Sequence, residues 1–85
     1  MEIVIYTEAK PETGLGHLTR CLSIYHAFLE LKQIPLLVIH CHEVFLPFLK
    51  NINFVNKDWI TDLNSLDWIT NQSIVIIDSY LAGRF

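Results

Sequence analysis

Short apolar runs alternate along this chain with segments in which apolar residues recur every three or four positions. The apolar runs predict four strands, which span Glu2–Tyr6, Ile34–His40, Asn53–Val55 and Ser73–Asp78. The periodic segments between them predict three helices, which span His17–Lys32, Glu43–Lys50 and Asp62–Thr70. Continuous apolar runs are typical of parallel strands that are buried on both faces. We therefore expect an α/β fold, a Rossmann-like three-layer open parallel sheet in the order β-α-β-α-β-α-β.

The expected boundaries depend on a few residues. The polar segment Thr7–Gly16 predicts a loop after the first strand. The first helix must stop before Pro35, although Gln33 stands where a helix-ending glycine is more usual. Pro47 has to lie in the first turn of the second helix. The run Ser73–Asp78 predicts a buried strand like the others.

Composition narrows the class of protein. The 85 residues allow a single domain. A hydrophobic fraction of 52% supports a folded core and indicates that some apolar surface contacts a partner. The net charge is −3 and the six Lys and Arg residues are scattered, which excludes a basic footprint for nucleic acid. No apolar stretch is long enough to span a membrane, and the N-terminus does not resemble a signal peptide. We expect a cytoplasmic protein.

Cysteine usage agrees with that location. Cys21 and Cys41 are expected to be free, largely buried thiols. The triplet His40-Cys41-His42 hints at a metal, but neighbouring residues of an extended segment point to opposite faces, so at best His40 and His42 share one. The sequence has no second ligand pair at the spacing of structural zinc sites, so a metal site is disfavoured.

Two polar clusters fall at the carboxyl ends of predicted strands, where parallel α/β sheets bind ligands. The first is Gly14-Leu15-Gly16-His17 at the start of the first helix, with Arg20 three residues later. A glycine loop that leads into a helix favours an anion such as phosphate. A histidine there can act as a general base, and an arginine can bind phosphate or carboxylate. The second cluster is Asp78-Ser79-Tyr80 after the fourth strand.

Simpler interpretations remain open for both clusters. The glycines Gly14 and Gly16 can serve only a tight turn, with His17 an ordinary early helical residue, and Asp78 can be a solvated carboxylate. Dinucleotide binding is disfavoured, because the loop lacks the third glycine of that fingerprint and His40, not an acidic residue, ends the second strand. We expect no cofactor.

Both clusters also resemble a known family. A strand, the pattern Gly-x-Gly-His-x-x-Arg-Cys-Leu and an apolar helix resemble the start of the UDP-sugar hydrolases of pseudaminic acid biosynthesis and the related spore-coat polysaccharide biosynthesis proteins. Here the pattern consists of Gly14, Gly16, His17, Arg20, Cys21 and Leu22. The segment Ile76–Tyr80 resembles the strand-end Asp-x-Tyr of the same family. More distantly, the loop is similar to that of the N-acetylglucosaminyltransferase that acts on peptidoglycan lipid intermediates.

The resemblance implies a GT-B arrangement, in which two Rossmann-like domains enclose an active site that hydrolyses a UDP-linked amino sugar without a metal. By the same resemblance, His17 is the catalytic residue that activates water for attack on the anomeric carbon. The implied substrate-binding residues are Gly14, Gly16, Arg20, Asp78 and Tyr80. The implied pathway class is surface polysaccharide or nonulosonic acid biosynthesis.

Members of that family are much longer than this chain. We therefore expect residues 1–85 to form one partial domain, the N-terminal part of a GT-B enzyme whose C-terminal domain is missing, and to be inactive alone. The alternative is a non-catalytic, glycosyltransferase-like module that binds an anion or self-associates, for example as a homodimer. An open sheet edge exposes unpaired backbone groups and favours such association.

Overall fold

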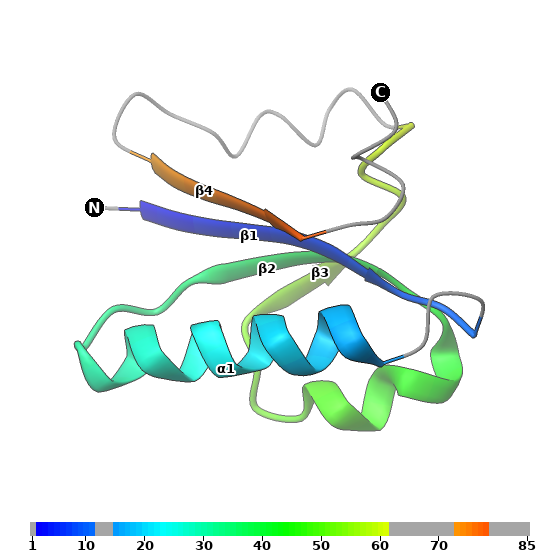
Figure 1. Cartoon of the computed structure of the whole chain (residues 1–85), viewed down its shortest axis with the longest axis horizontal. Helices are drawn as coiled ribbons and strands as arrows, with labels where there is room; N and C mark the ends of the chain where they lie inside the picture. The colour runs from blue at the N-terminus through cyan, green and yellow to red at the C-terminus, as the bar shows by residue number, and fades with distance from the viewer. Residues whose placement is uncertain (1, 12–14, 62–72, 79–85) are drawn as a thin grey trace.

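Four parallel strands form the centre of the molecule. The computed structural model describes residues 2–11, 15–61 and 73–78 (Figure 1). The strands are β1 (Glu2–Ala9), β2 (Leu36–Cys41), β3 (Phe54–Asn56) and β4 (Ser73–Asp78), and they lie in the order β3-β2-β1-β4. The α/β class and the parallel sheet are thereby confirmed. The helix predicted over Asp62–Thr70, and with it the third layer, lies outside the described residues.

Two helical segments connect the first three strands. Helix α1 (Gly16–Glu30) joins β1 to β2, and the short 3-10 helix η1 (Glu43–Leu49) joins β2 to β3. Both lie on the same side of the sheet in Figure 1. No helix within the described ranges is long and apolar enough to cross a membrane.

Strand β1 continues to Ala9, so the prediction of a loop from Thr7 onward is wrong. Thr7 and Glu8 are both fully buried, and the pairing with β2 runs on through Glu8↔His40 and Ala9↔Cys41. Polar residues at the carboxyl end of a strand give a loop-like sequence pattern even where the backbone still makes ladder hydrogen bonds. This extension matters because it carries Thr7 to the edge of the sheet where the predicted site lies.

Helix α1 ends at Glu30, two residues before the predicted end at Lys32. The N–H of Lys32 donates to the carbonyl of Leu29, and the N–H of Gln33 donates to that of Phe28, which is the Schellman pattern of a helix end. Lys32 occupies the left-handed position of this motif, with φ 61°. The residue that stands where glycine is usual is therefore Lys32 and not Gln33.

The second predicted helix is a 3-10 helix, and Pro47 lies in its interior rather than in its first turn. Proline has no N–H to donate and crowds the preceding turn of an α-helix, so an α-helix does not form around it. The imidazole of His42 caps the segment by accepting a hydrogen bond from the N–H of Val44 at 3.2 Å.

The core has two unequal parts, one on each face of the sheet. On the α1 face, β1 and β2 pack against the buried side of α1; the central residues there are Ile3, Ile5, Leu37, Ile39, Leu18, Cys21 and Tyr25. On the opposite face, Val4, Tyr6 and Val38 form a smaller cluster that Trp59 covers. The Trp59 indole donates to the carbonyl of Thr7 at 2.7 Å, which ties Trp59 to the end of β1.

Strand β4 is less buried than predicted. Ile74, Val75 and Ile77 are 38%, 37% and 57% exposed, whereas β1 and β2 are almost completely buried. The reason is its position: among the described strands, β4 is an edge strand that pairs only with β1. The apolar run predicts a strand correctly, but it does not reveal the place of that strand in the sheet.

Candidate functional site

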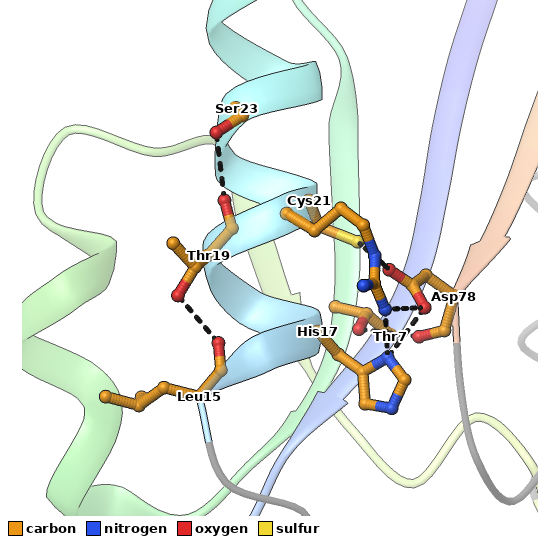
Figure 2. A network of polar contacts seen from close by, with 8 residues as sticks. Thr7, Leu15, His17, Thr19, Cys21, Ser23 and Asp78 are labelled. Atoms are coloured by element: carbon orange, nitrogen blue, oxygen red, sulfur yellow. Dashed lines mark hydrogen bonds and ion pairs between the residues drawn. The ribbon is translucent and has the colours of Figure 1, made fainter.

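The site lies where the carboxyl end of β4 meets the first turn of α1. Asp78 is the last residue of β4 and is the register partner of Thr7 in β1. Register partners project to the same face of a sheet, and for this pair it is the face that α1 covers. His17 is the second residue of α1, and Arg20 follows three residues later on the same side of the helix. The topology thus brings His17 of the first predicted cluster next to Asp78 of the second (Figure 2).

The Asp78 carboxylate binds both of these side chains. Arg20 donates through Nε to Oδ2 at 2.5 Å and through Nη2 to Oδ1 at 2.8 Å, which makes a bidentate ion pair. Nδ1 of His17 lies 2.6 Å from Oδ1 of Asp78. Nη2 of Arg20 also lies 3.0 Å from that same Nδ1. The Asp78 side chain is 18% exposed and that of His17 is 7% exposed.

Asp78 is ionised at neutral pH. The hydrogen bond from Arg20 lowers its pKa most, partial burial opposes this, and the hydrogen bond from His17 lowers the pKa further. An ionised carboxylate can only accept hydrogen bonds. The short contact with His17 therefore requires a proton on Nδ1, which donates to Oδ1 of Asp78.

This requirement settles the role of the second contact at Nδ1. Guanidinium groups only donate, so Nη2 of Arg20 cannot bind an Nδ1 that already carries a proton. Nη2 directs its hydrogen bond to Oδ1 of Asp78 instead. The neutral imidazole of His17 is then the Nδ1–H tautomer, and its lone pair is on Nε2, at the opposite side of the ring. Figure 2 shows the Nδ1 edge of His17 turned toward Asp78. An imidazole held in this way has the tautomer that general-base chemistry at Nε2 requires, and Nε2 itself is buried in this structure.

Two further side chains contact Asp78, and sequence reasoning gave neither of them a role. The hydroxyl of Thr7 donates to the backbone carbonyl of Asp78 at 2.8 Å. The thiol of Cys21 lies 3.9 Å from Oδ2 of Asp78, and burial raises its pKa to about 11. Cys21 was part of the recognised sequence pattern, and its place four residues after His17 was the available signal. Thr7 gave none, because it was expected in a loop.

The beginning of α1 is open on its outer side. Leu15 precedes the helix and makes no side-chain capping hydrogen bond; its carbonyl accepts from the N–H of Thr19 at 2.9 Å. A Cβ added at Gly16 would meet nothing within 4 Å, and the backbone of Gly16 is not in the left-handed region. A tight turn at this residue therefore does not explain Gly16. The absent side chain leaves free space beside the helix end, next to the 59% exposed side chain of Arg20.

The remaining predicted site residues are Gly14 and Tyr80, and both lie outside the described residues. His40 belongs to neither cluster: it lies on the other face of the sheet, with Nδ1 3.7 Å from Oδ1 of Asp58. Cys21 and Cys41 are free and buried, as predicted. In the part of the chain that the structure describes, no three His, Cys, Asp or Glu side chains gather in a way that could hold a metal ion.

The site therefore consists of a histidine oriented by a carboxylate, an arginine beside it and the first turn of α1. Comparisons with family models, with curated proteins and with solved structures found no match for this chain.

Proposed function

We propose that this chain provides the general base for the hydrolysis of a nucleotide-linked amino sugar. Nε2 of His17 takes a proton from water, the water oxygen forms a bond to the anomeric carbon, and the bond from that carbon to the phosphate oxygen breaks. The nucleoside diphosphate leaves with the bonding electron pair. The observation that carries the proposal is the short contact between Nδ1 of His17 and the ionised Asp78, which leaves Nε2 as the basic atom.

Groups that attract anions lie close to His17 and support this substrate class. The first turn of α1 and the exposed guanidinium of Arg20, which belongs to that same part of the helix, both attract phosphate. The strand order β3-β2-β1-β4 matches the first four strands of doubly wound nucleotide-binding sheets, which bind ligands at this edge. The resemblance of both motifs to UDP-sugar hydrolases favours UDP as the leaving group.

Three further features belong to the same proposal. The sugar binds in a cleft that a second Rossmann-like domain completes, as in the GT-B arrangement. The reaction takes place in the cytoplasm, which the two free thiols support. The sugar product enters surface polysaccharide or nonulosonic acid biosynthesis.

A binding experiment tests the site without requiring turnover. UDP-N-acetylglucosamine is titrated into 15N-labelled protein, and the amide resonances are followed by NMR. We expect the largest shifts at Gly16, His17 and Leu18 and at the side chain of Arg20. Binding that leaves these resonances unchanged, or no binding at millimolar ligand, contradicts the proposal.

A turnover experiment tests the base itself. UDP release from a panel of UDP-linked amino sugars is measured in a form of the protein that also carries the second domain, for the wild type, His17→Ala and the control His26→Ala, an exposed histidine on the same helix. General-base catalysis contributes about 10²–10⁴-fold, so His17→Ala should lose that factor while His26→Ala keeps the wild-type rate. An unchanged rate in His17→Ala rules out the catalytic assignment.

A second candidate function is self-association through β4. The exposed apolar residues Ile74, Val75 and Ile77 lie on this strand, which borders only β1 among the described strands. An apolar edge strand favours pairing with a second copy. Light scattering over a concentration series should show a dimer that Ile77→Lys converts to a monomer. A wild-type chain that stays monomeric at high concentration excludes this function.

A further inference from the structure

Thr7 is a buried polar residue that the proposed reaction does not use directly. Its side chain is fully buried at the carboxyl end of β1, on the face that α1 covers. The residues of β1 that share this face, Ile3, Ile5 and Ala9, belong to the apolar core. Burying a hydroxyl at such a position costs free energy unless it is hydrogen-bonded. The identity of its hydrogen-bond partner therefore indicates what the residue does.

The partner of this hydroxyl is the backbone of the residue that orients the base. Oγ1 of Thr7 donates to the carbonyl of Asp78 at 2.8 Å, across a separation of 71 residues. The two residues form the last pair of the β1–β4 ladder. The same hydroxyl is within hydrogen-bonding reach of the Cys21 thiol, which in turn lies 3.9 Å from Oδ2 of Asp78. Thr7 thus contacts the strand end and the helix side of the site together (Figure 2).

Because of its location, this hydrogen bond affects the position of the Asp78 carboxylate. Asp78 is the terminal residue of a strand that is less buried than its neighbour β1, and strand ends of this kind fray readily. Rotation of the Asp78 backbone by a small angle would move the carboxylate relative to both His17 and Arg20, whose bonds to it are only 2.5–2.8 Å long. A bond from a fully buried hydroxyl to the Asp78 carbonyl opposes that rotation.

We propose that Thr7 is a positioning residue, which holds the end of β4 so that the Asp78 carboxylate stays in place against His17 and Arg20. Thr7 does not touch the reacting atoms and acts only through Asp78. Its effect on turnover rests on the proposed function of His17, whereas its effect on the orientation of Asp78 does not.

The test compares Thr7→Val, which keeps the β-branched shape and removes the hydroxyl, with Thr7→Ser, which keeps the hydroxyl. Ser23→Ala is the control, because the Ser23 hydroxyl also donates to a backbone carbonyl, that of Thr19, but has no contact with Asp78. Two quantities are measured by NMR in the protein without ligand: the pKa of Asp78 and the fraction of His17 in the Nδ1–H tautomer.

We expect Thr7→Val to raise the pKa of Asp78 toward its ordinary value and to lower the Nδ1–H fraction, with Thr7→Ser and Ser23→Ala close to the wild type. Since small displacements of a catalytic group cost about 10²-fold, UDP release by the form that also carries the second domain should fall by about that factor in Thr7→Val, with little change in KM. A folded Thr7→Val with wild-type values for both NMR quantities overturns the proposal.

A measurement on the wild type covers the case in which Thr7→Val does not fold. The hydroxyl proton of Thr7 should exchange with solvent much more slowly than that of Thr19, whose hydroxyl donates to Leu15 at the exposed start of α1. Equal exchange rates overturn the proposal. If the Thr7 effect on His17 is present but His17→Ala keeps its rate of UDP release, the positioning role stands and the base role of His17 fails.

Discussion

Nδ1 of His17 and Oδ1 of Asp78 lie 2.6 Å apart although 61 residues separate them in the chain. The contact joins the first turn of α1 to the last residue of β4, and Arg20 reinforces it with two further hydrogen bonds to the same carboxylate. One ionised group therefore has two tasks: it orients the imidazole, and it ties the less buried strand β4 to the helix.

The second task makes stability depend on pH through Asp78. Its pKa is lower in the folded state than its ordinary value of 3.8, mainly because of Arg20, so the folded state binds fewer protons at this group. The stabilisation is fully present above about pH 4 and is lost as the pH falls through the folded-state pKa. Asp78→Asn should lower the free energy of unfolding at pH 7 by about 1–3 kcal/mol, and the difference should shrink toward pH 2.

Denaturant unfolding between pH 2 and 7 measures this difference. Asp58→Asn is the matched control, because the side chain of Asp58 is 45% exposed and its pKa is lowered mainly by a hydrogen bond from Thr61. We expect Asp58→Asn to change the free energy of unfolding by no more than about 0.5 kcal/mol. A destabilisation by Asp78→Asn that does not vary with pH would show that the ion pair is not its cause.

Gly16→Ala separates a ligand-binding glycine from a structural one. Because an added Cβ meets no atom within 4 Å and alanine suits a helix better than glycine, the substitution should leave the free energy of unfolding unchanged or raise it by up to about 1 kcal/mol. If a phosphate approaches the start of α1, the same methyl group should weaken UDP binding. Calorimetry of UDP binding, with exposed Ala27→Ser farther along α1 as the control, should show weaker binding for Gly16→Ala only. Equal affinities would remove Gly16 from the site.

Lys32 is the clearest point of backbone strain in the described residues. Its φ of 61° places a residue with a Cβ in the left-handed region, at a helix end where glycine is favoured. Lys32→Gly should therefore raise the free energy of unfolding by about 0.5–1 kcal/mol in thermal or denaturant melts. Asn51→Gly, at φ 65°, should gain less, because asparagine tolerates this region. A gain of equal size at both positions would argue against this explanation.

The two thiols should react slowly while the protein is folded. Burial raises the pKa of Cys21 to about 11 and also raises that of Cys41, and only the thiolate is nucleophilic. With a neutral disulfide reagent at pH 8, Cys41, which is 7% exposed, should react before the fully buried Cys21, and denaturant should make both fast. Immediate reaction of Cys21 in the native protein would mean that the α1 face near Asp78 opens readily.

The sequence was sufficient for the parts of the fold that depend on local pattern. Apolar runs predicted all four strands, and helical spacing predicted α1, because each of these signals lies within a few residues. The strand β4 was predicted with its correct bounds. The end of β1 was missed because Thr7 and Glu8 owe their burial to pairing with β2 and β4, which no local pattern reveals.

In the candidate site, too, part of the arrangement could be predicted from the sequence and part could not. The rule that ligands bind at the carboxyl ends of parallel strands brought His17, Arg20 and Asp78 to one edge before their contacts were known. The tautomer of His17 and the role of Thr7 could not be predicted in this way. Both depend on which atoms of Asp78 face which neighbours, and that is decided by the register of β4 against β1.

The Nδ1–H tautomer of His17 is the central claim, because the basic Nε2 follows from it directly. The 15N chemical shifts of the His17 ring measure it in the protein without ligand at a pH where the ring is neutral. We predict a protonated Nδ1 and an unprotonated Nε2 in the wild type, and the reverse in Asp78→Ala, where Nη2 of Arg20 is left to donate to Nδ1. A wild-type His17 that carries its proton on Nε2 would contradict the account.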